Sequence, residues 1–353
     1  DAAACGNETA SERAMMRKFI IESVTYWTKE YHIDGFRFDL MGIHDIETMN
    51  KISNAVLKIN PDALLYGEGW TAKESPLPEK KRALKKHVQQ LPHVAAFNDD
   101  LRDGLKGSVF EDESLGFVSG AKNTEASIKF GIVGAIQHSQ INYSNVNYSD
   151  APWTLESWQS INYVSCHDNH TLFDKLKISR PDAALSELIA MDKLANAIVL
   201  TSQGTPFLHA GVEMLRTKNG AHNSYNLPDS INQINWNWKN DNKEVFKYYK
   251  NLIQLRKAHS AFTMHNALDI QKYIKFQKAN DSLVSFILEE HANGDTWKNI
   301  LVIYNAHNKN INYKIDGTWQ KAISGSTFDL QGSKSIKNTI DVPALSMYVA
   351  FQK

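Results

Sequence analysis

The spacing of hydrophobic and polar positions along this chain changes at about residue 261. Before it, apolar residues recur at helical spacing in segments that include residues 16–31, 49–56, 188–199 and 246–255. Short apolar runs at 35–39, 64–68, 93–98, 163–168 and 204–209 lie among these segments and predict five buried strands. The sequence TASE at residues 9–12 fits a capping box before the first helix. Strands that alternate with helices predict a parallel sheet with crossover helices.

After residue 261 the apolar positions alternate with period two. Residues 282–288 and 299–304 show this pattern, and turns are expected at Asn293-Gly294-Asp295 and at Asp316-Gly317. We therefore divide the chain into residues 1–261, which are α/β, and residues 262–353, which we expect to form an antiparallel β-sandwich domain.

Composition excludes some function classes and leaves others open. The chain has 353 residues, 42% of them hydrophobic, and its 39 basic and 39 acidic residues cancel. This balance favours neither a nucleic-acid partner nor an anionic membrane surface, and no apolar run is long enough to span a membrane. Cys166 lies in a predicted buried strand, so a disulfide with Cys5 is not expected.

Three predicted strands end in a carboxylate. These runs are GFRFD at residues 35–39, YGEGW at 66–70 and VSCHDNH at 164–170, which carry Asp39, Glu68 and Asp168. A single such acid is more often a helix cap or a solvated turn residue. Three acids at strand ends, with Arg37 two residues before one and His167 beside another, favour a catalytic cluster that hydrolyses a glycosidic bond.

The three runs, in this order, resemble motifs of the α-amylase clan of glycoside hydrolases. The longer contexts DGFRFDLMG at residues 34–42 and HNSYNLPDSINQINW at 222–236 are similar to those of type I pullulanases, which are starch-debranching enzymes. The resemblance implies a (β/α)8 barrel, of which the chain contains about the last five strands. The clan's first motif and the upstream signature of these pullulanases are absent from the sequence. We therefore expect a C-terminal portion with two exposed barrel edges, which is inactive alone or self-associates through those edges.

The resemblance also implies roles for individual residues. Asp39 is the expected nucleophile, Glu68 the general acid/base and Asp168 the residue that stabilises the transition state. Arg37 is expected to hold Asp39 ionised and oriented; a buried structural ion pair is the alternative, and both can hold at once. His167 is expected to bind the sugar beside Asp168.

Outer contacts are predicted on both sides of the scissile bond. Trp70 is the expected stacking platform on the leaving-group side, where Met41 and His44 also lie, and Asn223 and Tyr225 are placed on the non-reducing side by family context. Glu213 is interpreted as structural. No cofactor is expected, and a structural calcium ion, common in relatives, has no site that the acidic residues identify.

The sequence thus predicts a retaining hydrolase of α-1,6 branch linkages in pullulan, starch or glycogen fragments. Two alternatives stay open. One is an isoamylase-like or glucan-branching relative, and the other is a non-catalytic glucan-binding piece, which would follow from the missing strands.

Overall fold

A computed structural model describes all residues, 1–353. Its first part contains one parallel sheet in the order β1-β2-β3-β4-β5. The strands are β1 (Gly35–Phe38), β2 (Leu64–Gly67), β3 (Ala95–Phe97), β4 (Ser160–Asn162) and β5 (Thr205–Pro206). The predicted parallel sheet of five strands is confirmed, although its fourth strand does not lie at the predicted residues. The sheet is open, with β1 and β5 at its two edges.

The fourth strand lies at residues 160–162, before the predicted run at 163–168. Regular pairing of β4 ends at Asn162, so residues 163–168 lie outside the sheet. Its neighbours explain this: β3 pairs with β4 only through Ala96 and Phe97, and β5 pairs only through Thr205 and Pro206. Without partner strands beyond these residues, the apolar run cannot continue as a strand. Cys166 is consequently half-buried in a loop, not within a strand.

The four long helices lie where the apolar periodicity places them. They are α1 (Ala14–Tyr31), α2 (Ile46–Leu57), α6 (Leu185–Thr201) and α9 (Lys243–Ala258). Of these, α6 and α9 pack on one another and form the centre of the largest buried cluster. Shorter helices complete this part: α3 (Asp99–Lys106), α4 (Glu125–Ile132), α5 (Leu172–Ser179), α7 (Asp229–Asn232), α8 (Trp238–Asp241) and α10 (Ala267–Tyr273).

The predicted capping box before α1 is wrong. The helix begins after Arg13 without a side-chain cap. Ser11 is instead fully buried, and its hydroxyl donates to Asp45, which caps α2 by accepting from the Thr48 N–H at 2.9 Å. Ser11 therefore joins two distant segments, and the residues before α1 do not cap that helix.

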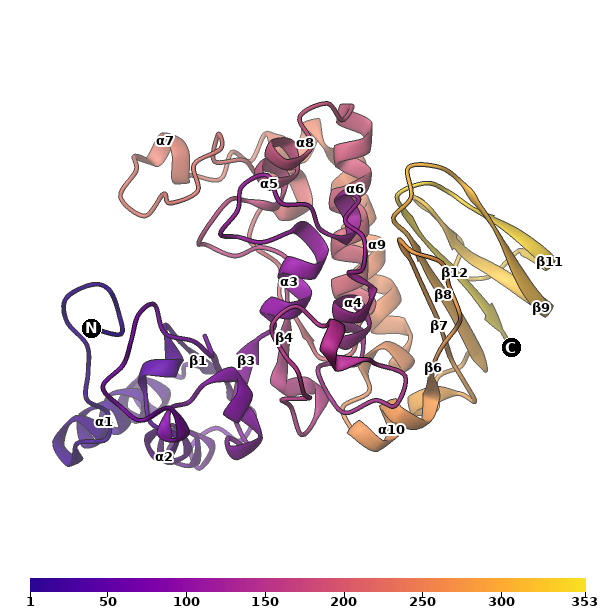
Figure 1. The fold of residues 1–353 in the computed structure, drawn as a ribbon. Helices are drawn as coiled ribbons and strands as arrows, with labels where there is room; N and C mark the ends of the chain where they lie inside the picture. Colours follow the sequence, from indigo (N-terminus) through magenta and orange to yellow (C-terminus); the bar gives the residue numbers. More distant parts are fainter.

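An antiparallel sheet forms the second part of the chain. Its strands are β6 (Ile274–Phe276), β7 (Leu283–Leu288), β8 (Asn299–Asn305), β9 (Ile311–Ser324), β10 (Thr327–Phe328), β11 (Lys334–Val342) and β12 (Ser346–Gln352). They form one sheet in the order β10-β9-β12-β8-β7-β6, with β11 also paired to β9. The sheet stands beside α6 and α9 and contains the C-terminus (Figure 1).

Period-two alternation correctly located β7 and β8 but misplaced one turn. Asp316 and Gly317 lie within the 14-residue strand β9, where the pairing with β11 shifts register opposite them. Gly317 has φ +78°, a conformation that suits glycine, so the predicted turn is a bulge in a continuous strand. The expected boundary at residues 261/262 falls within a buried 3₁₀ helix, Ser260–Thr263. The division into two domains stays a prediction.

Candidate active site

Arg37 joins two of the three predicted carboxylates. It lies in β1, and its guanidinium donates to Asp39, which follows that strand, and to Glu68 Oε1 at 2.6 Å, which follows β2. Adjacent parallel strands place their carboxyl ends at one edge of the sheet, which is why residues 29 positions apart meet here. The guanidinium also lies over the Phe97 ring of β3, 5.9 Å from its centre.

Glu68 is the buried member of this group. It is 5% exposed, whereas the Asp39 side chain is 68% exposed. Burial raises the pKa of Glu68; the Leu40 N–H, which donates to Oε2 at 2.8 Å, and Arg37 oppose this shift, while Asp39 and Asp168 add to it. The two carboxyls therefore differ in environment: burial favours the neutral form of Glu68, and Asp39 lies in water.

Asp168 approaches the same edge from the loop after β4. Its charge acts on the pKa of Glu68, and His167 Nε2 lies 3.5 Å from its Oδ1. The Cys166 thiol raises the pKa of His167, burial opposes this shift, and the charge of Asp168 adds to it. The structure therefore groups Asp39, Glu68, Asp168, Arg37 and His167 at one end of the parallel sheet.

The residues predicted on the leaving-group side of the substrate lie in two different environments, a cavity wall and the buried core. Trp70 lines a cavity of about 840 Å³ that runs from Gly69 to Tyr148 and Trp153. Met41 is fully buried in the main core, which does not match its predicted place at the substrate. His44 is also largely buried; its ring packs edge-on to Phe38, and its Nδ1 has no hydrogen-bond partner. Because β1 ends at Phe38, the chain turns inward through Met41 instead of following the rim.

The loop from 217 to 230 carries Asn223 and Tyr225, both exposed, the latter by 82%. Between them, buried Ser224 accepts from Lys218 Nζ at 2.7 Å. The same Nζ donates to the His167 carbonyl at 2.9 Å, so Lys218 anchors this loop beside the Asp168 segment. Glu213 accepts from the Gly211 N–H at 3.0 Å within its own turn, a local structural contact.

Sequence reasoning missed three contributors to this site. The Leu40 backbone N–H, the Phe97 ring and Lys218 each contact a predicted site residue. Neither a backbone donor nor a lysine in a polar loop has a sequence signal that identifies it. Phe97, which ends a predicted strand neighbouring the two acids, could have been chosen by its position.

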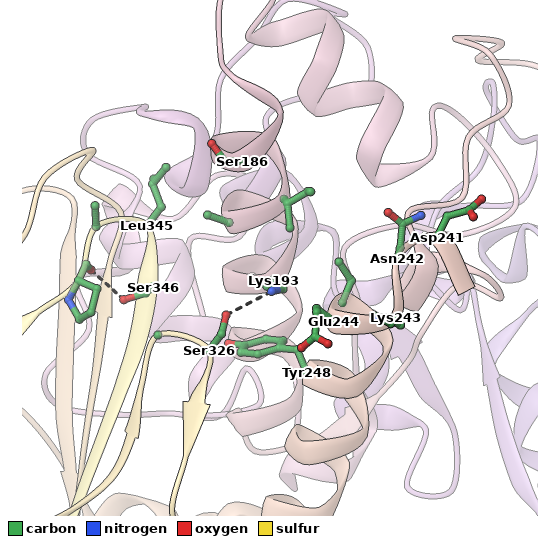
Figure 2. A pocket seen from close by; sticks show the side chains of 16 residues that line it. Ser186, Lys193, Asp241, Asn242, Lys243, Glu244, Tyr248, Ser326, Leu345 and Ser346 are labelled. Carbon is green, nitrogen blue, oxygen red and sulfur yellow. Dashed lines mark hydrogen bonds between the residues drawn. The ribbon is translucent and has the colours of Figure 1, made fainter. Parts of the chain in front are cut away.

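A second hollow lies between the two parts of the chain, away from the acids. Its volume is about 510 Å³, and it is lined by α6, the start of α9 and the loops before β10 and β12 (Figure 2). Lys193 Nζ bridges the parts by donating to Ser326 Oγ at 3.2 Å. None of the three predicted acids lines this hollow, so we do not take it as the active site.

The structure contains no cluster of three or more His, Cys, Asp or Glu side chains arranged to hold a metal ion. None of its helices combines the length and apolar composition needed to cross a bilayer.

Comparisons with known proteins agree on one family. Residues 270–326 match the model described as "Pullulanase, all-beta domain". The pullulanase of Bacillus subtilis strain 168 is 37% identical over 98% of this chain and 47% of its own length. The structure superposes on the pullulanase of Bacillus acidopullulyticus with a TM-score of 0.93 at 41% identity, covering 99% of this chain and 42% of that one. The pullulanase of Paenibacillus barengoltzii, solved with maltohexaose and α-cyclodextrin, gives a TM-score of 0.90 at 42% identity, covering 100% of this chain and 53% of that one.

Fold, acids and relatives together place the chain in a family of glycoside hydrolases. That family is the pullulanases, to which the chain is homologous along nearly its whole length. The chain spans about half the length of the pullulanases cited above.

Proposed function

We propose that this chain carries the carboxylates of a retaining hydrolase that cleaves α-1,6 branch linkages in pullulan, starch or glycogen-derived glucans. One observation supports this above the others. Buried Glu68 and exposed Asp39 share a single guanidinium at the strand ends, and the charge of Asp168 reaches Glu68. A retaining mechanism requires two carboxyls about 5 Å apart with opposite protonation states.

In the proposed reaction Asp39 attacks the anomeric carbon and forms a glycosyl ester while Glu68 protonates the departing oxygen. Glu68 then removes a proton from the water that hydrolyses the ester, and Asp168 with His167 stabilises the positive charge that develops on the sugar. Both Glu68 oxygens accept hydrogen bonds in the resting site. Proton donation therefore requires that Arg37 release Oε1 towards the sugar.

The substrate is proposed to lie across the acids, with its leaving-group arm in the cavity beside Trp70. Asn223 and Tyr225 would line the opposite arm, because Lys218 ties their loop to His167. The relative solved with maltohexaose supports a maltooligosaccharide as the ligand class.

Because the sheet is open, we expect the chain by itself to lack part of the proposed activity. We propose that residues 1–261 are part of a (β/α)8 barrel and that residues 262–353 form the second domain. Strands β1 and β5 lack outer partners, and α1 exposes Met15, Phe19 and Tyr31 by 74%, 68% and 56%. An apolar helix face and a sheet edge of this kind require a covering segment or a second copy. We expect the chain alone to bind glucan without hydrolysing it.

A chimera tests this proposal. The N-terminal half of the Bacillus subtilis relative joined to this chain should release maltotriose from pullulan, and Asp39→Asn should abolish release. A folded chimera that cleaves only α-1,4 chains would contradict the α-1,6 assignment. Preference for glycogen would indicate the isoamylase-like alternative, and transfer without net hydrolysis would indicate a branching enzyme.

A fluorinated glycosyl substrate separates the catalytic chimera from the isolated chain. We expect mass spectrometry to find the covalent label on Asp39 in the chimera and no label on the chain alone. Labelling of the isolated chain would show that five strands suffice for the first chemical step.

A further inference from the structure

Tyr148 exposes half of its surface in the cavity beside Trp70. It belongs to the segment between α4 and β4, which contains only two short 3₁₀ turns, Tyr143–Asn145 and Ser157–Gln159, so no regular element includes it. An exposed tyrosine in such a loop ordinarily moves among rotamers.

Hydrogen bonds nevertheless hold Tyr148 at both ends. Its hydroxyl donates to Asp103 Oδ2 at 2.5 Å, and its backbone N–H donates to Asp100 Oδ1 at 2.8 Å. The next residue adds two more bonds to the same carboxylate, from the Ser149 N–H at 3.0 Å and from its hydroxyl at 2.6 Å. The two acids lie one turn apart on α3 and are 0% and 4% exposed.

Each acid is itself held by a buried cation. Arg102 donates from Nε to Asp103 Oδ1 at 2.5 Å and from a terminal nitrogen to Oδ2 at 3.0 Å, and its other terminal nitrogen donates to the Tyr163 hydroxyl at 2.9 Å. Lys85 donates to Asp100 at 2.9 Å, and its Nζ lies 5.8 Å from the Tyr148 ring centre. The Asp103 carboxylate that accepts from the Tyr148 hydroxyl is therefore itself fixed in orientation by Arg102.

The pattern is a rigid support beneath an exposed ring. Anchoring the loop alone would need only the bonds from the backbone and from Ser149. The hydroxyl bond to Asp103 adds nothing to the loop backbone, but it fixes the ring plane. A fixed aromatic face binds a sugar ring with little further loss of side-chain entropy.

We propose that Tyr148 is a stacking platform for the leaving-group arm of an α-glucan, beyond Trp70, and that Asp103 is its positioning residue. This inference rests on the proposed function. It extends the binding surface along the cavity from the acids to the far loop.

Calorimetric titration of the full chain with maltohexaose tests the inference. Tyr148→Ala should weaken binding about fivefold, the loss expected for one aromatic contact. Tyr148→Phe keeps the ring and removes only the bond to Asp103, so it should weaken binding about twofold. Asp103→Leu, which removes the acceptor, should resemble Tyr148→Phe in affinity. Tyr26→Ala is the matched control, because Tyr26 is 53% exposed on α1 and lies outside the cavity.

The outcomes separate this inference from the proposed function. Full affinity in Tyr148→Ala together with weak binding in Trp70→Ala would overturn the platform and leave the function standing. Full affinity in Tyr148→Phe and in folded Asp103→Leu would overturn the positioning role. No binding of maltohexaose by the unmodified chain would overturn the inference and the glucan-binding part of the proposed function together.

Discussion

Replacing Arg37 by leucine should destabilise the chain in a pH-dependent way. Arg37 supplies a charge-assisted hydrogen bond to Glu68 Oε1, and Glu68 is 5% exposed. Loss of such a bond to a buried charged group costs about 1.5–3 kcal/mol. Asp39 is well solvated, so losing its bond to Arg37 should add at most about 0.5 kcal/mol. We expect a total loss of about 2–3 kcal/mol at pH 8.

The pH dependence follows from the pKa of Glu68, which burial raises and Arg37 lowers. Arg37→Leu removes the lowering influence and raises this pKa further. The penalty is therefore complete above the raised Glu68 pKa of the variant, and it shrinks as pH falls from there to the wild-type Glu68 pKa, because a neutral carboxyl does not need the cation.

Urea unfolding at pH 8 and pH 4, followed by tryptophan fluorescence, measures this effect. In a Glu68→Gln background the same substitution should cost at least about 1.5 kcal/mol less, because no buried charge remains. Lys18→Met is the control, since the Lys18–Glu22 pair is exposed on both sides and should contribute about 0.5 kcal/mol or less. A penalty for Arg37→Leu that is equal at both pH values and in both backgrounds would refute the reasoning.

Three further substitutions test separate parts of the structure. Burial raises the pKa of Asp192 to about 7, so wild-type stability should fall as pH rises from about 4 to 7. Asp192→Asn, which keeps an acceptor for the Tyr249 hydroxyl, should flatten that slope. Parallel curves of unfolding free energy against pH for the two proteins would contradict this. Met41→Ala should cost about 2–5 kcal/mol in urea unfolding because Met41 is fully buried, whereas an effect confined to maltohexaose affinity would restore its predicted substrate role. Lys218→Met should speed proteolysis of the loop from 217 to 230, by removing the anchors at His167 and Ser224; an unchanged cleavage rate would show that the loop is held by other contacts.

Local patterns predicted the regular elements because the information for them is local. The periodic apolar residues of α2, α6 and α9 face the main core, and successive residues of β7 and β8 face that core and a smaller one in alternation; these spacings are visible within ten to twenty residues. The errors occur where distant partners decide. β4 ends at Asn162 because β3 and β5 end, and the segment predicted to cap α1 is instead held to Asp45 through Ser11.

The predicted site shows the same difference between what local sequence determines and what distant partners determine. Residue types and motif order singled out Asp39, Glu68 and Asp168. The different exposures of Asp39 and Glu68, and the guanidinium that Arg37 shares between them, depend on the register of β1 against β2.

By itself, the sequence determined the long helices, a parallel sheet of five strands in the first part, and the acids that follow three of those strands. These properties depend on side-chain periodicity and on short connections, both of which are written along the chain. Only the tertiary structure decided that Glu68 is buried and Asp39 solvated, that Met41 faces the core, and that α3 holds Tyr148 in the cavity. Burial and hydrogen bonding at these positions depend on residues 30 to 60 places away, and a side chain's pKa and orientation are set by those neighbours.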